Sequence, residues 1–82
     1  MNTIGNNIKR FRERIGLSQE QVGSFLGKKR EQVAFYENGS RNPSIEELNQ
    51  LSDLFGIELS SLLEEDDEMN AVDVALALDQ MK

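Results

Sequence analysis

Apolar residues recur every three or four positions along the first part of the chain, which is the spacing of one face of an α-helix. The first stripe consists of Ile4, Ile8, Phe11 and Ile15. The cations and the acid between residues 9 and 14, Arg12 among them, fall on the other faces and are expected to meet solvent. Gly16 follows the stripe, and a glycine in this place commonly ends a helix. The pattern predicts a first helix that ends before Gly16.

A second helix is predicted to open at Ser18. Ser18 and Gln21 have the spacing of a capping box, in which each side chain binds the other residue's backbone N–H group. Gly27 marks the expected end of the helix. Its predicted apolar face consists of Val22, Phe25 and Leu26.

A third helix is predicted over residues 30–38, with Gly39 closing it. Lys28 or Lys29 occupies the position where Ser, Thr, Asp or Asn normally caps a helix, and a lysine side chain accepts no amide hydrogen bond. The start of this helix is therefore expected to be weakly fixed. The residues expected to face inward are Val33 and either Tyr36 or Glu37.

Two further helices complete the predicted fold. Ser44 and Glu47 form a second capping box, and Gly56 ends the helix that follows it. The expected buried side of this fourth helix is formed by Ile45, Leu48, Leu51, Leu54 and Phe55. A short fifth helix is predicted from Ile57, Leu59, Leu62 and Leu63. Because no stretch alternates apolar and polar residues for long enough to form a strand, the expected class is all-α with five short helices.

The composition excludes several functional classes. The chain has 82 residues without cysteine or histidine, so it lacks thiolate ligands, cysteine nucleophiles and the usual general base. No catalytic residue, metal site or cofactor is expected. No apolar run approaches the roughly 20 residues that span a membrane. We therefore expect a cytoplasmic, nucleoid-associated protein with no membrane contact.

Charge divides the chain into two parts. Residues 1–57 hold eight lysines or arginines against seven acids, whereas residues 58–82 hold eight acids and only Lys82. The net charge of −6 therefore comes from the C-terminal part. The near-neutral body, with its clustered cations, can face a polyanion, and the acidic tail cannot. The predicted division is a domain at residues 1–63 followed by a separate segment at residues 64–82.

The segment at residues 64–82 combines an acidic run with an apolar stripe. Residues 64–68 read EEDDE, which is typical of a solvated linker, with DNA mimicry or calcium binding as alternatives. A short C-terminal helix is predicted from Ala71, Val74, Leu78 and Met81. Because so short a helix is marginal alone in water, it should pack on its own domain, on a second protomer or on a different protein.

The motifs of residues 18–57 together resemble the helix-turn-helix family of phage repressors, Cro proteins and Xre-type regulators. The likeness covers about residues 4–63. It depends on Ser18–Gln19, Leu26–Gly27, Val33, the stretch from Glu37 to Ser44, and the Leu-x-x-Leu-x-x-x-Phe-Gly pattern that follows. The resemblance implies a lambda-repressor-like domain of five helices, with the third helix in the DNA major groove. It also implies that Glu37 is structural and bridges the third helix to its neighbours.

The expected DNA contacts follow from this resemblance and from side-chain chemistry. Arg30 can bond both acceptors of guanine, Gln32 can pair with adenine, and Glu31 can accept from cytosine or repel other bases. Phe35 has either a thymine methyl or the protein core as its partner. Gln19 and the loop after the third helix are expected to meet phosphates, and the lysines either phosphates or guanine. The full predicted set is Gln19, Lys28, Lys29, Arg30, Glu31, Gln32, Phe35, Asn38, Ser40, Arg41 and Asn42.

The function predicted from the sequence is therefore that of a sequence-specific regulator of double-stranded DNA. It is expected to repress transcription as a homodimer on an inverted repeat. The alternative is an antitoxin or immunity-type repressor whose residues 64–82 bind a toxin, peptidase or antirepressor. A third hypothesis, a protein-interaction module without DNA binding, draws on the net acidity. An enzyme is not expected, since no nucleophile and base form a pair.

Overall fold

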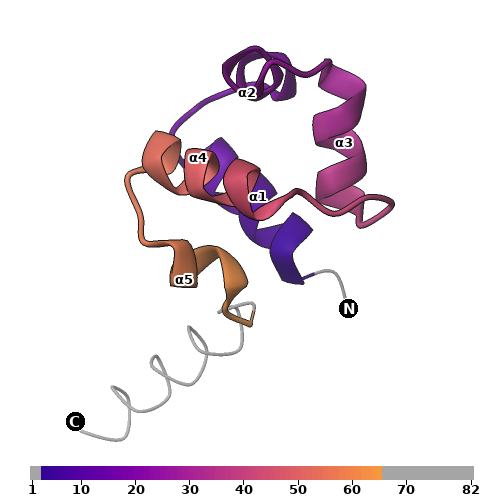
Figure 1. The fold of residues 1–82 in the computed structure, drawn as a ribbon. Coiled ribbons are helices and arrows are strands. Elements are labelled where there is room, and N and C mark those ends of the chain that lie inside the picture. Colours follow the sequence, from indigo (N-terminus) through magenta and orange to yellow (C-terminus); the bar gives the residue numbers. More distant parts are fainter. Residues whose placement is uncertain (1–2, 66–82) are drawn as a thin grey trace, which may run out of the picture.

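The computed structural model describes residues 3–65, which form five helices (Figure 1). These are α1 (Thr3–Arg14), α2 (Gln19–Leu26), α3 (Arg30–Asn38), α4 (Ile45–Phe55) and α5 (Leu59–Leu63). Between residues 3 and 65 there is no strand, so the all-α prediction is confirmed there, as are the bounds of the third helix. The expected C-terminal helix and most of the acidic run lie outside the described residues.

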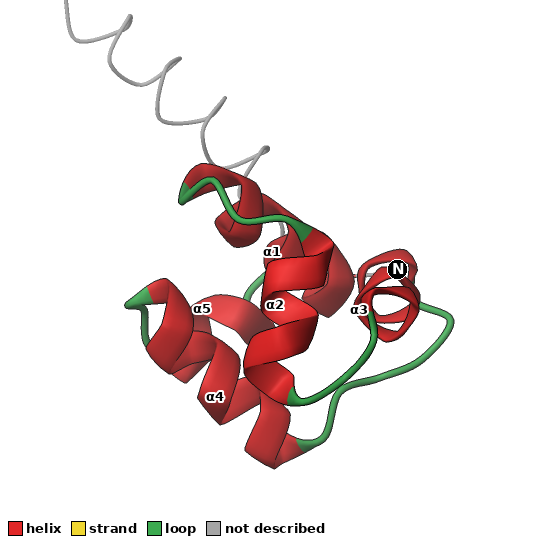
Figure 2. Ribbon diagram, turned by 90° about the horizontal axis from the view of Figure 1, so that it is seen from above, coloured by secondary structure: helices red, strands yellow, loops and turns green. Residues whose placement is uncertain are grey.

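The helices enclose one core. α1 packs against α3, α4 and α5, and α2 packs against α3. Figures 1 and 2 show α2 and α3 crossing steeply, with α3 at one side of the domain and α5 at the other. The buried apolar residues from all five helices form a single cluster, which consists of Ile8, Phe11, Val22, Val33, Tyr36, Leu48, Leu51, Phe55 and Leu62. This shared core fixes α3 at the edge of the domain.

Local signals at the helix ends are confirmed. The Ser18 hydroxyl accepts from the Gln21 N–H at 3.0 Å, and the Gln21 side chain accepts from the Ser18 N–H at 2.8 Å. Ser44 and Glu47 form the same reciprocal pair. Gly39 ends α3 with a φ of 84°, in the left-handed region that favours glycine. These contacts fix the helix ends without help from distant parts of the chain.

Four apolar residues that the helical stripes placed inward are exposed instead, so those predictions were wrong. Ile15 is 46%, Phe25 47%, Ile45 65% and Leu63 46% exposed. Each lies near the end of an element: Ile15 follows α1, Phe25 lies in the last turn of α2, Ile45 is the first residue of α4, and Leu63 is the last residue of α5. The apolar period continues to the end of a helix, but the side chains at the end no longer pack against neighbouring helices.

The expectation that Arg12 faces solvent was also wrong, because both Arg12 and Asn7 are buried. Arg12 lies one turn after Ile8, and Asn7 lies one turn before Phe11, so both share the inward side of α1. The buried face of α1 is therefore wider than its apolar stripe. Such polar groups are stable inside a domain only when their hydrogen bonds are satisfied.

Asn7 satisfies this condition by binding the end of α5. Its Nδ2 donates to the carbonyl oxygen of Leu62 at 2.8 Å and to that of Glu64 at 2.7 Å. Its Oδ1 accepts from Arg10 at 3.1 Å. The last carbonyls of a helix have no partner within the helix, so Asn7 supplies one for α5. The contact joins the first helix to the last.

Candidate nucleic-acid interface

The turn between α2 and α3 packs closely on α2 at Gly23. The Lys28 N–H donates to the Gly23 carbonyl oxygen at 2.8 Å. A Cβ atom added to Gly23 would lie 2.8 Å from the carbonyl oxygen of Lys28, closer than real Cβ contacts. Gly23 therefore lets the turn approach the α2 backbone, and this approach sets how α3 crosses α2. Sequence reasoning missed Gly23, because it drew attention only to the glycine at the turn itself.

A buried ion pair holds the far end of α3 against α1. The Nε of Arg12 donates to Oε2 of Glu37 at 2.6 Å, and its Nη2 donates to Oε1 at 3.1 Å. A third donor, Nη1, binds the Leu17 carbonyl oxygen at 2.8 Å. The hydrogen bond to Glu37 raises the pKa of Arg12, so the guanidinium stays charged. The expectation that Glu37 bridges α3 to its neighbours is confirmed.

Gln19 joins the same network from the first residue of α2. Its Nε2 donates to Oε1 of Glu37 at 3.0 Å, and the side chain is half-buried. The bond fixes the amide of Gln19 at the N-terminus of α2, where backbone N–H groups face outward. Contact between Gln19 and a phosphate stays a prediction. Its connection to the α3 carboxylate could not be read from the sequence.

The start and one face of α3 are open to solvent. Val33, Tyr36 and Glu37 face the core, and Gln32 is partly covered. The exposed face of α3, together with its cap, consists of Lys29, Arg30, Glu31, Phe35 and Asn38. Lys29 is the N-cap and makes no side-chain cap bond, as the sequence predicted. Two adjacent cations thus stand at the beginning of a helix that presents polar side chains outward.

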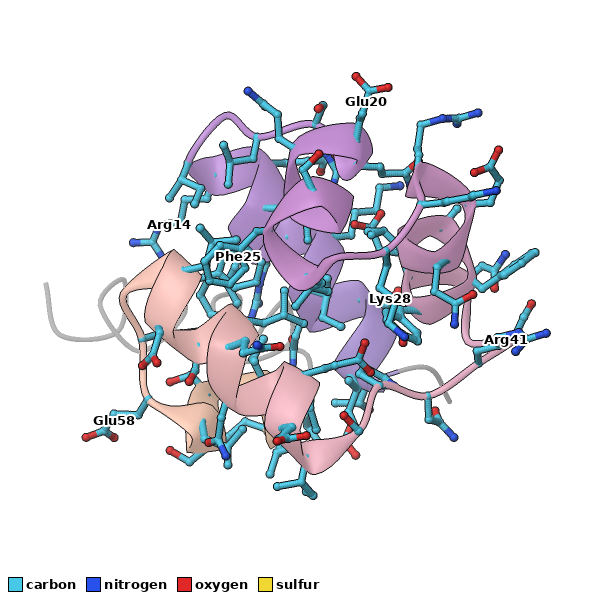
Figure 3. All side chains as sticks on the ribbon, turned by 45° about the horizontal axis from the view of Figure 1, so that its top comes forward. Arg14, Glu20, Phe25, Lys28, Arg41 and Glu58 are labelled. Carbon is cyan, nitrogen blue, oxygen red and sulfur yellow. The ribbon has the colours of Figure 1, made fainter. Side chains whose placement is uncertain are left out.

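Lys28 and Gln32 turn toward α4 instead. The Nζ of Lys28 lies 3.9 Å from Oε2 of Glu47, so it lies between α3 and the start of α4 (Figure 3). The Tyr36 hydroxyl donates to Glu47, at 2.8 Å from Oε1 and 3.0 Å from Oε2, and Gln32 Nε2 lies 3.5 Å from that hydroxyl oxygen. Two residues of the predicted DNA set are therefore also engaged within the protein.

Burial and hydrogen bonding shift the pKa values of Tyr36 and Glu47 apart. Burial raises the pKa of Tyr36; the Gln32 hydrogen bond lowers it and the Glu47 bond adds to the rise. Burial opposes ionisation of Glu47 as well. The bonds from Ser44 and Tyr36, with the charge of Lys28, outweigh burial and lower the pKa of Glu47. The ionised carboxylate and the neutral phenol therefore stabilise the fold.

We expect this pair to set the pH range of stability. The Glu47 contribution is complete above its ordinary pKa of 4.5 and is lost as the pH falls through its lower folded value. The Tyr36 contribution is complete below 10.0 and is lost as the pH rises through its higher folded value. Urea unfolding across this range measures both losses. Because Tyr36 is the single tyrosine, Tyr36→Phe should reduce the loss of stability at high pH. An unchanged loss would contradict the attribution of this effect to Tyr36.

The loop after α3 folds back on the helix. The Asn38 side chain accepts from the Ser40 N–H at 2.8 Å, and the Arg41 N–H donates to the Phe35 carbonyl oxygen at 3.2 Å. The Arg41 guanidinium lies 5.7 Å from the centre of the Phe35 ring. Asn38, Ser40, Arg41 and Asn42 are exposed, and Figure 3 shows Arg41 at the outer edge of the domain. The loop residues of the predicted set thus lie beside the exposed face of α3.

Other kinds of site are not found within residues 3–65. In that range, no three or more acidic side chains gather closely enough to hold a metal ion. No helix in the described part of the chain is long and apolar enough to cross a bilayer. The clustered functional groups of this domain are those around α2, α3 and the following loop.

Known proteins are similar to this chain in sequence and in fold. A family model described as "Helix-turn-helix" matches residues 8–62. An uncharacterised HTH-type transcriptional regulator of Archaeoglobus fulgidus is 33% identical over 61 residues, which are 74% of this chain and 87% of that protein. The restriction-modification controller protein C.AhdI from Aeromonas hydrophila is 32% identical, with a TM-score of 0.67 over 73% of this chain and 91% of that chain. The P22 c2 repressor, solved with a synthetic operator, has a TM-score of 0.70 at 24% identity over 77% of this chain and 96% of its own.

Proposed function

Because the chain belongs to the helix-turn-helix family, we propose that it is a sequence-specific transcriptional regulator that binds double-stranded DNA through α3. The observation that carries this proposal is the exposed face of α3, which begins with Lys29 and Arg30 and is held by the buried bonds of Glu37. A helix fixed at the edge of a domain can enter the major groove, and cations at its start offset phosphate charge.

Each part of the surface has a proposed role. The exposed α3 residues meet base edges, with Arg30 bonding guanine and Glu31 selecting against most bases. Gln19 and the lysines meet phosphates on one side of the groove. The loop residues Ser40 to Asn42 meet the sugar-phosphate backbone on the other side. Gln32, held near Tyr36, lies at the flank of this surface.

We propose that the protein acts as a homodimeric repressor in the cytoplasm, at the nucleoid. A single module of this size buries only about 600–1,000 Å² on DNA, which gives limited specificity. Two copies on inverted half-sites one helical turn apart would supply the remaining specificity. Repression then requires only that the dimer occupy a promoter. The likeness to a controller protein and to a repressor supports this form of action.

The proposal is tested by selecting from a random duplex pool with the purified full-length protein. We expect an enriched inverted repeat, whose half-site spacing reports the geometry of the dimer. Circular dichroism should show that the protein used is folded. Folded protein that enriches no sequence would contradict sequence-specific regulation, while a single enriched half-site would contradict only the dimer.

Replacing Arg30 and Lys29 should separate base reading from phosphate contact. Arg30→Ala should lower affinity for the selected site by about 1–3 kcal/mol and relax the preference at one base pair. Lys29→Ala should weaken binding to all sequences alike and reduce the salt dependence by about one unit. Affinities measured at several salt concentrations check both. If both variants changed base preference and salt dependence alike, the division between base reading by Arg30 and phosphate contact by Lys29 would be contradicted. Lys28 is a poorer comparison, since it already lies beside Glu47.

A further inference from the structure

Phe35 occupies the exposed face of α3 without belonging to the core. Its side chain is 39% exposed, and it is not among the residues of the core cluster. Glu31, one turn earlier, is exposed on the same side of the helix. An aromatic ring at the centre of a surface proposed to enter DNA needs a partner there, in the protein or in the base pairs.

The partner within the protein is Arg41, which is bound to Phe35 in two ways. The Arg41 backbone N–H donates to the Phe35 carbonyl oxygen at 3.2 Å, and the guanidinium lies 5.7 Å from the ring centre. The left-handed Gly39 and the bond between Asn38 and the Ser40 N–H make the reversal that brings Arg41 back. The backbone hydrogen bond and the side-chain contact therefore both place the Arg41 guanidinium over the Phe35 ring.

A guanidinium placed over an aromatic ring keeps its hydrogen-bonding capacity. The attraction uses the face of the cation and the negative face of the ring. The N–H groups lie at the edge of the guanidinium plane, so they still point outward and can bind a phosphate through two bonds. The ring also restricts a long side chain that would otherwise sample many rotamers. Arg41 is therefore oriented for a phosphate before DNA arrives.

We propose that Phe35 is a positioning residue, which acts on DNA by holding the Arg41 guanidinium ready for the sugar-phosphate backbone. This inference rests on the proposed function, since it gives a role to one residue of the same surface. It differs from both sequence-based alternatives, in which Phe35 touches a thymine methyl group or belongs to the protein core. An exposed cation–π contact of this kind corresponds to roughly a two- to fivefold effect on affinity.

A double-mutant cycle on the full-length protein tests this role. Phe35→Ala, Arg41→Ala and the double variant are titrated with the selected duplex and with a random duplex, at two salt concentrations. We expect Phe35→Ala to weaken both duplexes by the same factor of roughly two to five and to leave the base preference unchanged. In the Arg41→Ala background, Phe35→Ala should not lower the affinity for either duplex any further. Arg41→Ala alone should also reduce the salt dependence by about one unit.

Two conservative variants separate the ring from its apolar surface. Phe35→Tyr keeps an aromatic face and should bind as the wild type does. Phe35→Leu keeps an apolar group for a thymine methyl but loses the ring, so it should behave as Phe35→Ala does. Thermal unfolding of each variant shows that the domain is intact, which is expected because Phe35 lies outside the core.

Other results would overturn the inference. If Phe35→Ala changes the preference at one base pair, or has the same effect with and without Arg41, then Phe35 contacts DNA itself. That outcome would leave the proposed function standing, because the wild type would still select a sequence. If the wild type selects no sequence but Phe35 and Arg41 remain coupled on random duplex, sequence-specific regulation fails and the positioning role stands. If the wild type binds no duplex, both fail.

Discussion

Replacing Glu37 by alanine is expected to lower the free energy of unfolding by about 3–5 kcal/mol. The substitution leaves the charged guanidinium of Arg12 buried without its carboxylate, and it removes the acceptor of the Gln19 amide. A domain of this size has a total stability on the order of 5–10 kcal/mol. The variant should therefore keep only part of the wild-type stability and unfold at a markedly lower urea concentration, as urea unfolding followed by circular dichroism would measure.

Glu31→Ala is the matched control, because it removes an acid from the exposed face of the same helix. Glu31→Ala should change the free energy of unfolding by no more than about 0.5 kcal/mol. A double variant, Arg12→Met with Glu37→Leu, should be more stable than Glu37→Ala, since no buried charge then lacks a partner. Similar stabilities of Glu37→Ala and Glu31→Ala would show that the ion pair does not hold α3 in place.

Replacing Gly23 by valine is expected to lower the free energy of unfolding by about 1–3 kcal/mol or more, the second largest of the expected effects. Even a single added carbon would meet the Lys28 carbonyl oxygen at 2.8 Å, and that neighbour is backbone that cannot rotate away. The turn must move off α2, which changes how α3 crosses it. DNA affinity should therefore fall further than stability does, measured where the variant is still folded.

Two neighbouring substitutions control for other effects of valine. Ser24→Val places the same side chain at an exposed position of α2 and should change stability little. Gly23→Ala adds the same close carbon, but a gain of up to about 1 kcal/mol of helix propensity offsets part of the cost, so it should lose less stability than Gly23→Val does. If Gly23→Val and Ser24→Val behave alike, the close approach at Gly23 does not set the geometry of the turn.

The helix ends were predictable because their signals are local. The capping box of Ser18 and Gln21 forms between residues three positions apart, and Gly39 needs only its own backbone conformation. Periodicity also predicted that Val33 is buried and Glu31 exposed. The sequence therefore determined which helices form and which side of α3 meets solvent.

Partners far apart in the chain could not be predicted. Asn7 and Leu62 are separated by 55 positions, and Arg12 and Glu37 by 25. A polar residue on the border of an apolar stripe gives no sign of whether a distant partner will bury it. Gly23 was missed for a different reason: its neighbour, the backbone of Lys28, is close in the chain, but a glycine inside a helix gives no sign of which backbone approaches it.

Within the candidate site, residue types were predictable but their contacts were not. The sequence marked Lys28 as a surface residue of the helix-turn-helix motif and left Phe35 between a base contact and the core. It could not show that Lys28 lies beside Glu47, or that Phe35 lies beneath Arg41. Those contacts depend on side-chain rotamers and on where α4 and the loop approach α3.

The closure of α5 by Asn7 has a consequence for how the protein is made. Leu62 is part of the core, and the carbonyls of Leu62 and Glu64 are the acceptors of a side chain in the first helix. On the ribosome, the nascent chain emerges from its N-terminus, so nearly sixty further residues must be made before α5 can cover Asn7. We therefore expect this domain to complete its folding only after translation through Glu64, and a chain stalled earlier to keep an open, protease-sensitive core.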